Sequence, residues 1–124
     1  MRYDRHMEII VAKEPVSRET LSALASEWYL SLVKGVADIE RDVVALGGEW
    51  HMDANTRLIE DGSEQKNLWG FNVYPEKTGG VAIEYISLIN IRPAQGNRSM
   101  EIESEETRMA VRQVVARIIP FLGL

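Results

Sequence analysis

Hydrophobic positions recur along the chain with two periods, one typical of strands and one typical of helices. An apolar run at Glu8–Ala12 predicts a short buried strand. A helical stripe follows Ser17, a residue type that favours the N-cap position, and predicts an amphipathic helix. The apolar members of that stripe are Leu21, Leu24, Ala25, Trp28 and Leu32.

The middle of the chain alternates between strand-like runs and turn signals. Leu32–Ile39 and Val43–His51 are rich in β-favouring residues and flank a charged turn, which predicts an antiparallel hairpin. Asp53 then caps a short predicted helix that reaches about Asp61, where Gly62 favours a positive φ.

A second pair of strands and a last helix complete the pattern. Leu68–Tyr74 and Val81–Arg92 are predicted to pair around the turn-forming stretch between them. The helix begins near Ser104, and Pro120 ends it before the apolar tail Phe121–Leu124. We expect that tail to pack on the sheet or against a second subunit.

The predicted order is βαββαββα, an α+β fold with a mostly antiparallel five-stranded sheet and helices largely on one face. The length of 124 residues suits one domain, which we assign to residues 7–124, with residues 1–6 as a flexible extension.

Composition narrows the function classes. The net charge of −5 repels a polyanion, so no nucleic-acid partner is expected. No apolar run is long enough for a membrane span, and cysteine is absent, so we expect no membrane association, no disulfides and a cytoplasmic location. Phosphate-binding Gly-rich loops, serine elbows and His-Glu-x-x-His motifs do not occur.

One face of the sheet gathers polar residues. If Ile39 pairs with Val44, Lys34 lies opposite Glu49 and Asp38 lies beside a hollow on the face away from the helices. The hypothesis is that the polar positions of both hairpins border one cleft: Asp38, Glu40, Glu49, His51, Asn72, Tyr74, Asn90 and Arg92.

The stretch from Ile89 to Ser99 has the strongest character of a site. Arg92 and Arg98 offer two guanidinium groups that suit a carboxylate or phosphate, and Asn90, Gln95, Asn97 and Ser99 offer orienting groups. Two alternatives stay open. The loop is an ordinary strand-to-helix connection, or its arginine pairs with a buried carboxylate.

Asp38, Glu49 and His51 are the candidates for acid–base chemistry. The competing interpretation of Asp38 is a solvated strand face. Glu49, His51 and Asp53 also have a spacing that could direct three ligands to a metal, but a helix cap explains Asp53 more simply, so we assign no metal site. Trp50, Trp69 and Phe71 are expected in the core, with a wall of the cleft as the alternative.

Four motifs resemble a family of small uncharacterised prokaryotic proteins classed as a domain of unknown function. They are Val36–Arg41, Gly47–Asp53, Leu68–Pro75 and Ile89–Ser99, and with their flanks they cover Met7 to about Ile119. The resemblance implies a shared fold and no assigned activity, cofactor or mechanism.

The leading hypothesis is therefore a small-molecule site for an anionic metabolite, with hydrolase-like or isomerase-like chemistry as the reaction classes to test. Whether the chain is an enzyme is left open. The alternative is a non-catalytic interaction module, in which the polar cluster is a buried network and the C-terminal tail forms a homodimer.

Overall fold

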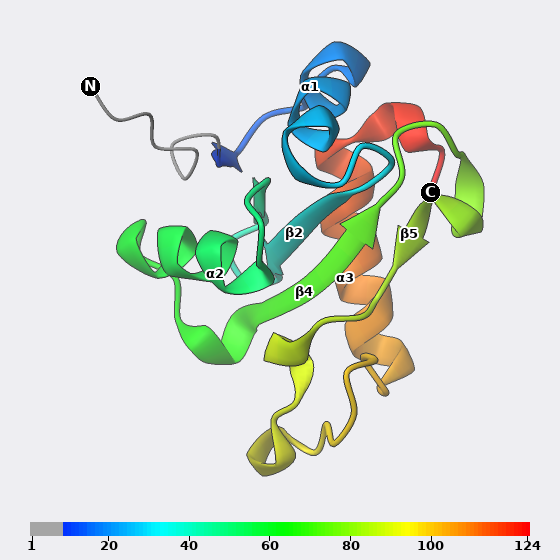
Figure 1. The fold of residues 1–124 in the computed structure, drawn as a ribbon. Helices are drawn as coiled ribbons and strands as arrows, with labels where there is room; N and C mark the ends of the chain where they lie inside the picture. Colours follow the sequence, from blue (N-terminus) through cyan, green and yellow to red (C-terminus); the bar gives the residue numbers. More distant parts are fainter. Residues whose placement is uncertain (1–8) are drawn as a thin grey trace.

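A five-stranded antiparallel sheet forms the centre of the computed structural model, which describes residues 9–124 (Figure 1). The strands are β1 (Ile10–Ala12), β2 (Val33–Asp38), β3 (Val43–Leu46), β4 (Leu68–Val73) and β5 (Ile83–Glu84). Their spatial order is β1-β3-β2-β4-β5. The extension predicted for residues 1–6 lies outside the described residues.

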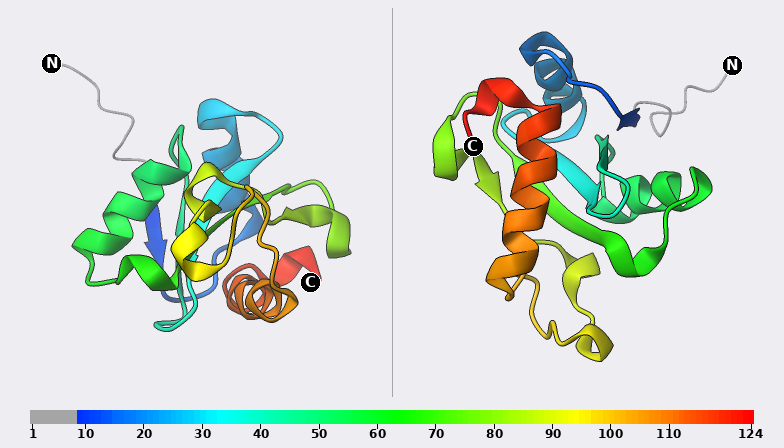
Figure 2. Two further views of the ribbon diagram at one scale, coloured as in Figure 1. Left: turned by 90° about the horizontal axis from the view of Figure 1, so that it is seen from below. Right: turned by 180° about the vertical axis from the view of Figure 1, so that it is seen from behind.

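Three α-helices cover the two faces of this sheet. They are α1 (Arg18–Trp28), α2 (His51–Glu60) and α3 (Glu105–Ile118). Residues of α1 and α3 share one buried cluster with the sheet, whereas α2 packs on the opposite face (Figure 2). This arrangement confirms the predicted α+β fold and its element order, with two of the three helices on one face.

Helices α1 and α3 begin where their N-cap serines predict. Ser17 Oγ accepts a hydrogen bond from the backbone N–H of Thr20 at 3.1 Å, and Ser104 Oγ accepts one from Thr107 at 3.2 Å. Each bond satisfies a backbone donor that has no partner within its helix.

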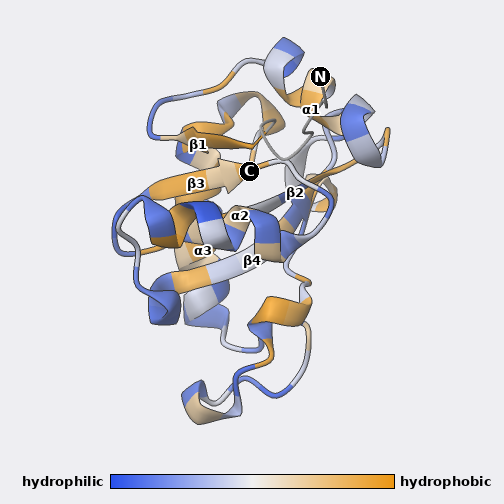
Figure 3. Cartoon of the chain, turned by 60° about the vertical axis from the view of Figure 1, so that its left-hand side comes forward, coloured by the Kyte–Doolittle hydropathy of each residue, from blue (hydrophilic) through white to orange (hydrophobic). Residues whose placement is uncertain are grey.

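Side chains alternate between two apolar clusters along the central strands. On β2, Val33 and Ala37 contribute to the cluster under α1 and α3, whereas Val36 contributes to the cluster under α2. Gly35 lies between Val33 and Ala37 on the face under α1 and α3. Glycine suits this position because the Phe71 ring fills the space of a side chain there, with a ring carbon only 2.4 Å from where a Cβ would be. In Figure 3, β1 and β3 are hydrophobic, while paler positions occur along β4.

The first hairpin forms as predicted, with a register two residues from the expected one. Ala37 pairs with Val44, not with Leu46, because the last pair of the hairpin is Asp38 with Val43 and residues 39–42 form the connection, in which Asp42 adopts a φ of 60°. A shift by two positions keeps every side chain on its predicted face. It removes the expected pairing of Lys34 with Glu49.

The prediction of a strand reaching His51 is wrong. Gly47 and Gly48 adopt φ values of 110° and 90°, a backbone conformation that favours glycine, and they end β3 at Leu46. The chain then enters α2 at His51. Asp53 lies inside the first turn, where its carboxylate accepts a hydrogen bond from the backbone N–H of Trp50 at 3.1 Å. The prediction that Asp53 is the N-cap residue is therefore wrong, because Trp50 holds that position.

The predicted strand at Val81–Arg92 is also mostly wrong, since only Ile83–Glu84 joins the sheet. Beyond it, a 3₁₀ helix at Leu88–Asn90 replaces the strand. The Asn90 amide bonds both backbone groups of Gly70, accepting from its N–H at 2.8 Å and donating to its carbonyl at 3.1 Å. A side chain therefore substitutes for strand pairing along this edge of β4.

The C-terminal tail packs within the chain. Leu122 is fully buried, and Phe121 and Leu124 pack against the same cluster as α3. The apolar tail thus has intramolecular cover, and homodimerisation stays a prediction. Within residues 9–124, no helix combines the length and the apolar character needed to cross a membrane.

Candidate functional site

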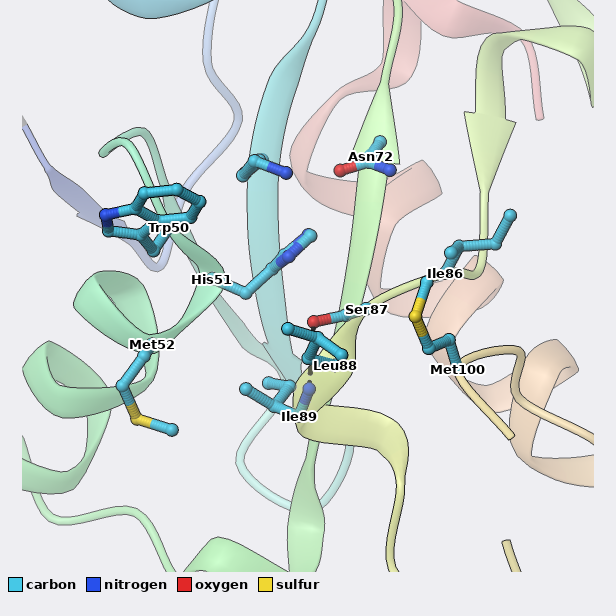
Figure 4. Close-up of a pocket in the computed structure, with 10 residues that line it drawn as sticks. Trp50, His51, Met52, Asn72, Ile86, Ser87, Leu88, Ile89 and Met100 are labelled. Atoms are coloured by element: carbon cyan, nitrogen blue, oxygen red, sulfur yellow. Dashed lines mark hydrogen bonds between the residues drawn. The ribbon is translucent and has the colours of Figure 1, made fainter. Parts of the chain in front are cut away.

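A hollow of about 480 Å³ opens on the α2 face of the sheet (Figure 4). Its volume falls in the range that holds small organic ligands. The lining side chains come from β2, the start of α2, β4 and the segment after β5: Lys34, Trp50, His51, Met52, Asn72, Ile86, Ser87, Leu88, Ile89 and Met100. We call this hollow the α2-face pocket.

A polar row crosses three strands at one edge of the α2-face pocket. Lys34 on β2 pairs in register with Asn72 on β4, and Asn72 pairs with Glu84 on β5. Residues opposite one another on neighbouring strands point to the same face of the sheet. The pairing of β2 with β4 therefore brings together two polar groups that are far apart in the sequence.

Lys34 supplies the positive charge of the α2-face pocket. Its ammonium group lies over the ring of Tyr29, with Nζ 4.9 Å from the ring centroid. Among the described residues, Nζ has neither a hydrogen bond nor an ion pair within 4.0 Å. Burial lowers the pKa of the Lys34 ammonium, against the opposing effect of the Glu84 carboxylate.

His51 is a buried, neutral member of the α2-face pocket. Its Nε2 lies 2.9 Å from the carbonyl oxygen of Phe71, which only accepts, so Nε2 carries the proton. Burial lowers the pKa of the imidazole from 6.5 to about 4, and the nearby Lys34 ammonium adds to this effect, whereas the Phe71 carbonyl and the Asn72 side chain favour the protonated ring and oppose it. The ring is therefore neutral at physiological pH, with Nδ1 as its acceptor nitrogen.

Asn72 carries the unsatisfied acceptor of the site. The residue is 8% exposed, and its Nδ2 donates to Glu84 Oε1 at 3.3 Å. Tyr74 donates to the same carboxylate oxygen at 2.8 Å. Since an acceptor facing Glu84 would be repelled, this contact fixes the amide orientation. Oδ1 is buried without a partner among the described residues, and in Figure 4 it faces the side where His51 lies.

Apolar side chains form the rim of the α2-face pocket. Leu88 is 72% exposed and Trp50 is 58% exposed, and Met52 and Met100 are exposed as well. The expectation that Trp50 is a core residue is therefore wrong, whereas Trp69 and Phe71 are buried as predicted.

Of the residues predicted for acid–base chemistry, only His51 lines this pocket. Asp38 lies at the other end of β2 from Lys34, about 13 Å along the strand. It is fully buried, and its Oδ1 accepts from the backbone N–H groups of Glu40 and Arg41, both at 2.9 Å. Glu49 is half-buried, and its backbone carbonyl accepts from the Tyr29 hydroxyl.

Side chains of the polar loop predicted to bind an anion are largely engaged with backbone carbonyls of the segment that leads into β4. Arg92 donates to the carbonyls of Gln65 and Leu68 and stacks on the Trp69 ring at 4.0 Å. Gln95 accepts from Arg92 at 3.2 Å and donates to the Lys66 carbonyl at 3.1 Å. Burial lowers the pKa of the Arg92 guanidinium, whose Nε is buried without a partner in the described chain.

Asn97 organises the rest of that loop. Its Nδ2 donates to the carbonyls of Asn90, Ser99 and Glu101, and its Oδ1 accepts from the Glu103 N–H at 2.8 Å. Ser99 Oγ donates weakly to Glu101 at 3.3 Å. The Arg98 residue is exposed, and its backbone N–H donates to Glu103 at 3.0 Å.

The expected single cleft is therefore not formed. The structure brings His51 and Asn72 together in the α2-face pocket. Tyr74 supports Asn72 through Glu84, whereas Asp38 fixes a turn. Asn97 bonds to the loop backbone, and Asn90, Arg92 and Gln95 bond to backbone carbonyls of β4 and of the segment that precedes it.

Sequence reasoning missed Lys34 and Ser87 as pocket residues, and gave Trp50 a place in a cleft wall only as the alternative to the core. Lys34 lies on the same face of its strand as Asp38, a member of the predicted polar set. This two-residue alternation is the sequence signal that could have identified Lys34 as a site residue. Its position beside Asn72 depends on the pairing of β2 with β4, which no local pattern reveals.

No three His, Asp or Glu side chains in residues 9–124 are grouped so as to hold a metal ion. In the segment considered for such a set, His51 bonds the Phe71 carbonyl and Asp53 bonds the start of α2.

Comparison with known proteins gives one match. Residues 9–118 match the model of a family described as a protein of unknown function, DUF5674. This match confirms the resemblance to a domain-of-unknown-function family. Neither a curated protein nor a solved structure matches the chain.

Proposed function

We propose that this chain, which belongs to the DUF5674 family of proteins of unknown function, binds a small amphipathic anion in the α2-face pocket. The anionic group contacts the Lys34 ammonium, and the apolar body lies among the exposed side chains of the rim. This proposal keeps the anionic ligand expected from the sequence and assigns it a different cation.

The state of Lys34 carries the proposal. A half-buried ammonium group without an acidic or carbonyl partner is costly, because burial removes hydration that only an acceptor replaces. The face of Tyr29 offers partial compensation. A carboxylate supplied by a ligand would complete the pairing and recover more of the lost hydration.

The rim supports an apolar ligand body. Trp50 offers a large, rigid surface, and Met52 and Met100 adapt to ligands of different shape. Binding removes apolar area of the rim from water, and this contributes a favourable free energy of about 25 cal/mol for each Å², before the entropic cost of association. A mostly apolar lining with few convergent polar groups is the usual composition of a small-molecule site.

The geometry favours binding over turnover. An imidazole with a pKa near 4 is a weak base at physiological pH, and Nε2 of His51 is committed to a backbone carbonyl. The other two groups expected to take part in acid–base chemistry, Asp38 and Glu49, do not line the α2-face pocket.

A thermal-shift series tests this proposal. Aromatic and aliphatic carboxylates of increasing size are added to the wild-type protein, to Lys34→Met and to Lys77→Met. Lys77 is a matched control because its ammonium also lies over a tyrosine, Tyr74 at 4.6 Å, but outside the pocket. We expect stabilisation in the wild type and in Lys77→Met only. Equal stabilisation of Lys34→Met would contradict the role of Lys34.

Self-association through the same rim is a second candidate function. The exposure of Trp50 and Leu88, side by side with Met52 and Met100 around one hollow, is the observation that favours it. Sedimentation equilibrium on the wild type and on Leu88→Ser distinguishes the two. A dimer that the substitution dissociates would favour an interface between copies of the chain.

A further inference from the structure

We infer that the ligand of the α2-face pocket is a carboxylate with a hydrogen-bond donor close to it, a 2-hydroxy or 2-acylamino acid with an apolar side chain. The inference rests on the proposed function and specifies the ligand class. It is carried by the polar row of Lys34, Asn72 and Glu84, in which one acceptor is unpaired.

The buried Oδ1 of Asn72 requires a hydrogen-bond donor. A buried amide oxygen without a donor is costly, and such groups are rare in folded proteins. The amide cannot turn to solve this, because its Nδ2 donates to Glu84, which is itself held by the Tyr74 hydroxyl. A donor for Oδ1 must therefore come from outside the row.

The described residues around Asn72 do not supply this donor. The Asn72 side chain lies close enough to the His51 ring to favour its protonated form, but the neutral ring directs its one proton, on Nε2, to Phe71 and has none for Oδ1. Ser87 accepts from the Ile89 N–H at 3.2 Å and keeps its O–H as a donor, but no hydrogen bond joins it to Asn72 Oδ1. The pocket floor therefore offers a cation, the Ser87 hydroxyl and the two acceptors of His51 and Asn72, a set that complements an anion with an adjacent O–H or N–H.

The spacing of Lys34 and Asn72 suits a carboxylate with a donor on the neighbouring carbon. Lys34 and Asn72 are directly opposite on paired strands, so their side chains start about 5 Å apart. A carboxylate at the ammonium places a group on the neighbouring carbon near the amide. Oδ1 is shielded from solvent, so binding requires a neighbouring side chain to move, and the Lys34 side chain has no hydrogen bond or ion pair with a described residue that would hold it in place.

A matched ligand pair tests the inference. Phenyllactate and 3-phenylpropanoate differ by one hydroxyl group at the carbon beside the carboxylate. Calorimetric titration of the wild type is expected to give a dissociation constant roughly tenfold lower for phenyllactate, since a site with a buried acceptor favours a ligand that can donate to it. In Asn72→Val, which removes the acceptor but suits a strand, the two constants should agree within about threefold.

Each outcome decides one of the two claims. Equal binding of both compounds to the wild type would overturn this inference and leave the proposed function standing. A preference that persists in Asn72→Val would overturn the role of Asn72, and with it the inference. If neither compound, nor any carboxylate of the thermal-shift series, binds the wild type, the proposed function fails as well. The wild-type comparison decides even if the variant does not fold.

Discussion

Asn90 and Gly70 are joined by two hydrogen bonds in which a side-chain amide takes the place of a paired strand. The Gly70 N–H donates to Asn90 Oδ1 at 2.8 Å, and Asn90 Nδ2 donates to the Gly70 carbonyl at 3.1 Å. Glycine is required there because an added Cβ would lie 2.5 Å from the Cβ of Ser87. This contact anchors the segment that forms one wall of the α2-face pocket.

Replacing Asn90 should destabilise the protein strongly. Asn90→Leu leaves two buried backbone groups of Gly70 without partners, and we expect a loss of about 2–4 kcal/mol in the free energy of unfolding. Chemical denaturation followed by circular dichroism measures it. Ser99→Ala, which removes one exposed hydroxyl, is the control and should change stability by less than about 0.5 kcal/mol. Comparable losses in both variants would contradict this account of Asn90.

The two arginines of the same loop should differ in their effect on folding. Arg92→Ala removes contacts to two carbonyls and to the Trp69 ring, so we expect a loss of about 2 kcal/mol. Arg98→Ala alters an exposed side chain and should cost less than about 0.5 kcal/mol. Urea unfolding of both variants separates the roles, and an Arg92→Ala protein as stable as the wild type would show that these contacts contribute little.

Acid should destabilise the fold through His51. Its folded-state pKa is about 4, below the ordinary value of 6.5, so the unfolded chain takes up the proton first as the pH falls. The stability linked to neutral His51 is complete above about pH 6.5 and is lost progressively down to about pH 4. The loss is about 3 kcal/mol, since one pKa unit corresponds to about 1.4 kcal/mol.

His51→Gln is the control for that titration, because glutamine can keep a donor for the Phe71 carbonyl and does not titrate. Unfolding free energies of both proteins between pH 7 and pH 4 are compared. The wild type should lose about 3 kcal/mol more than the variant. Parallel pH profiles would mean that His51 is not the responsible group.

Two glycine substitutions test the packing between β2 and β4. Gly35→Ala places a methyl group 2.4 Å from the Phe71 ring, and we expect a loss of about 1–3 kcal/mol from overpacking. Gly80→Ala has open space around it and should be close to neutral. Thermal melts of the two variants give the comparison, and a neutral Gly35→Ala would show that the ring moves easily.

Local patterns in the sequence predicted the elements and faces of the fold well. The alternation in β2 separates Ala37 from Val36 correctly, and the serine caps mark the helix starts. The hairpin register was wrong by two residues because turn length depends on backbone conformation, here a positive φ at Asp42. The long strand predicted before Arg92 failed because a side chain, Asn90, satisfies the sheet edge.

The site was harder to predict, for a physical reason. The polar loop from Arg92 to Ser99 resembles a binding loop in composition, but most of its donors bond to backbone carbonyls that an irregular chain leaves unpaired. Lys34 and Asn72 lie side by side only because β2 pairs with β4, although β3 and α2 separate these strands in the sequence. Long-range pairing of this kind leaves no trace in short sequence windows.

The central claim is that an amphipathic anion binds at Lys34 in the α2-face pocket, and mapping by ¹H–¹⁵N NMR tests it most directly. The account predicts that 3-phenylpropanoate shifts the backbone amides of His51, Asn72 and Ser87, and that Lys34→Met abolishes these shifts while Lys77→Met retains them. Shifts confined to the loop around Arg98, or none up to millimolar ligand, would contradict it.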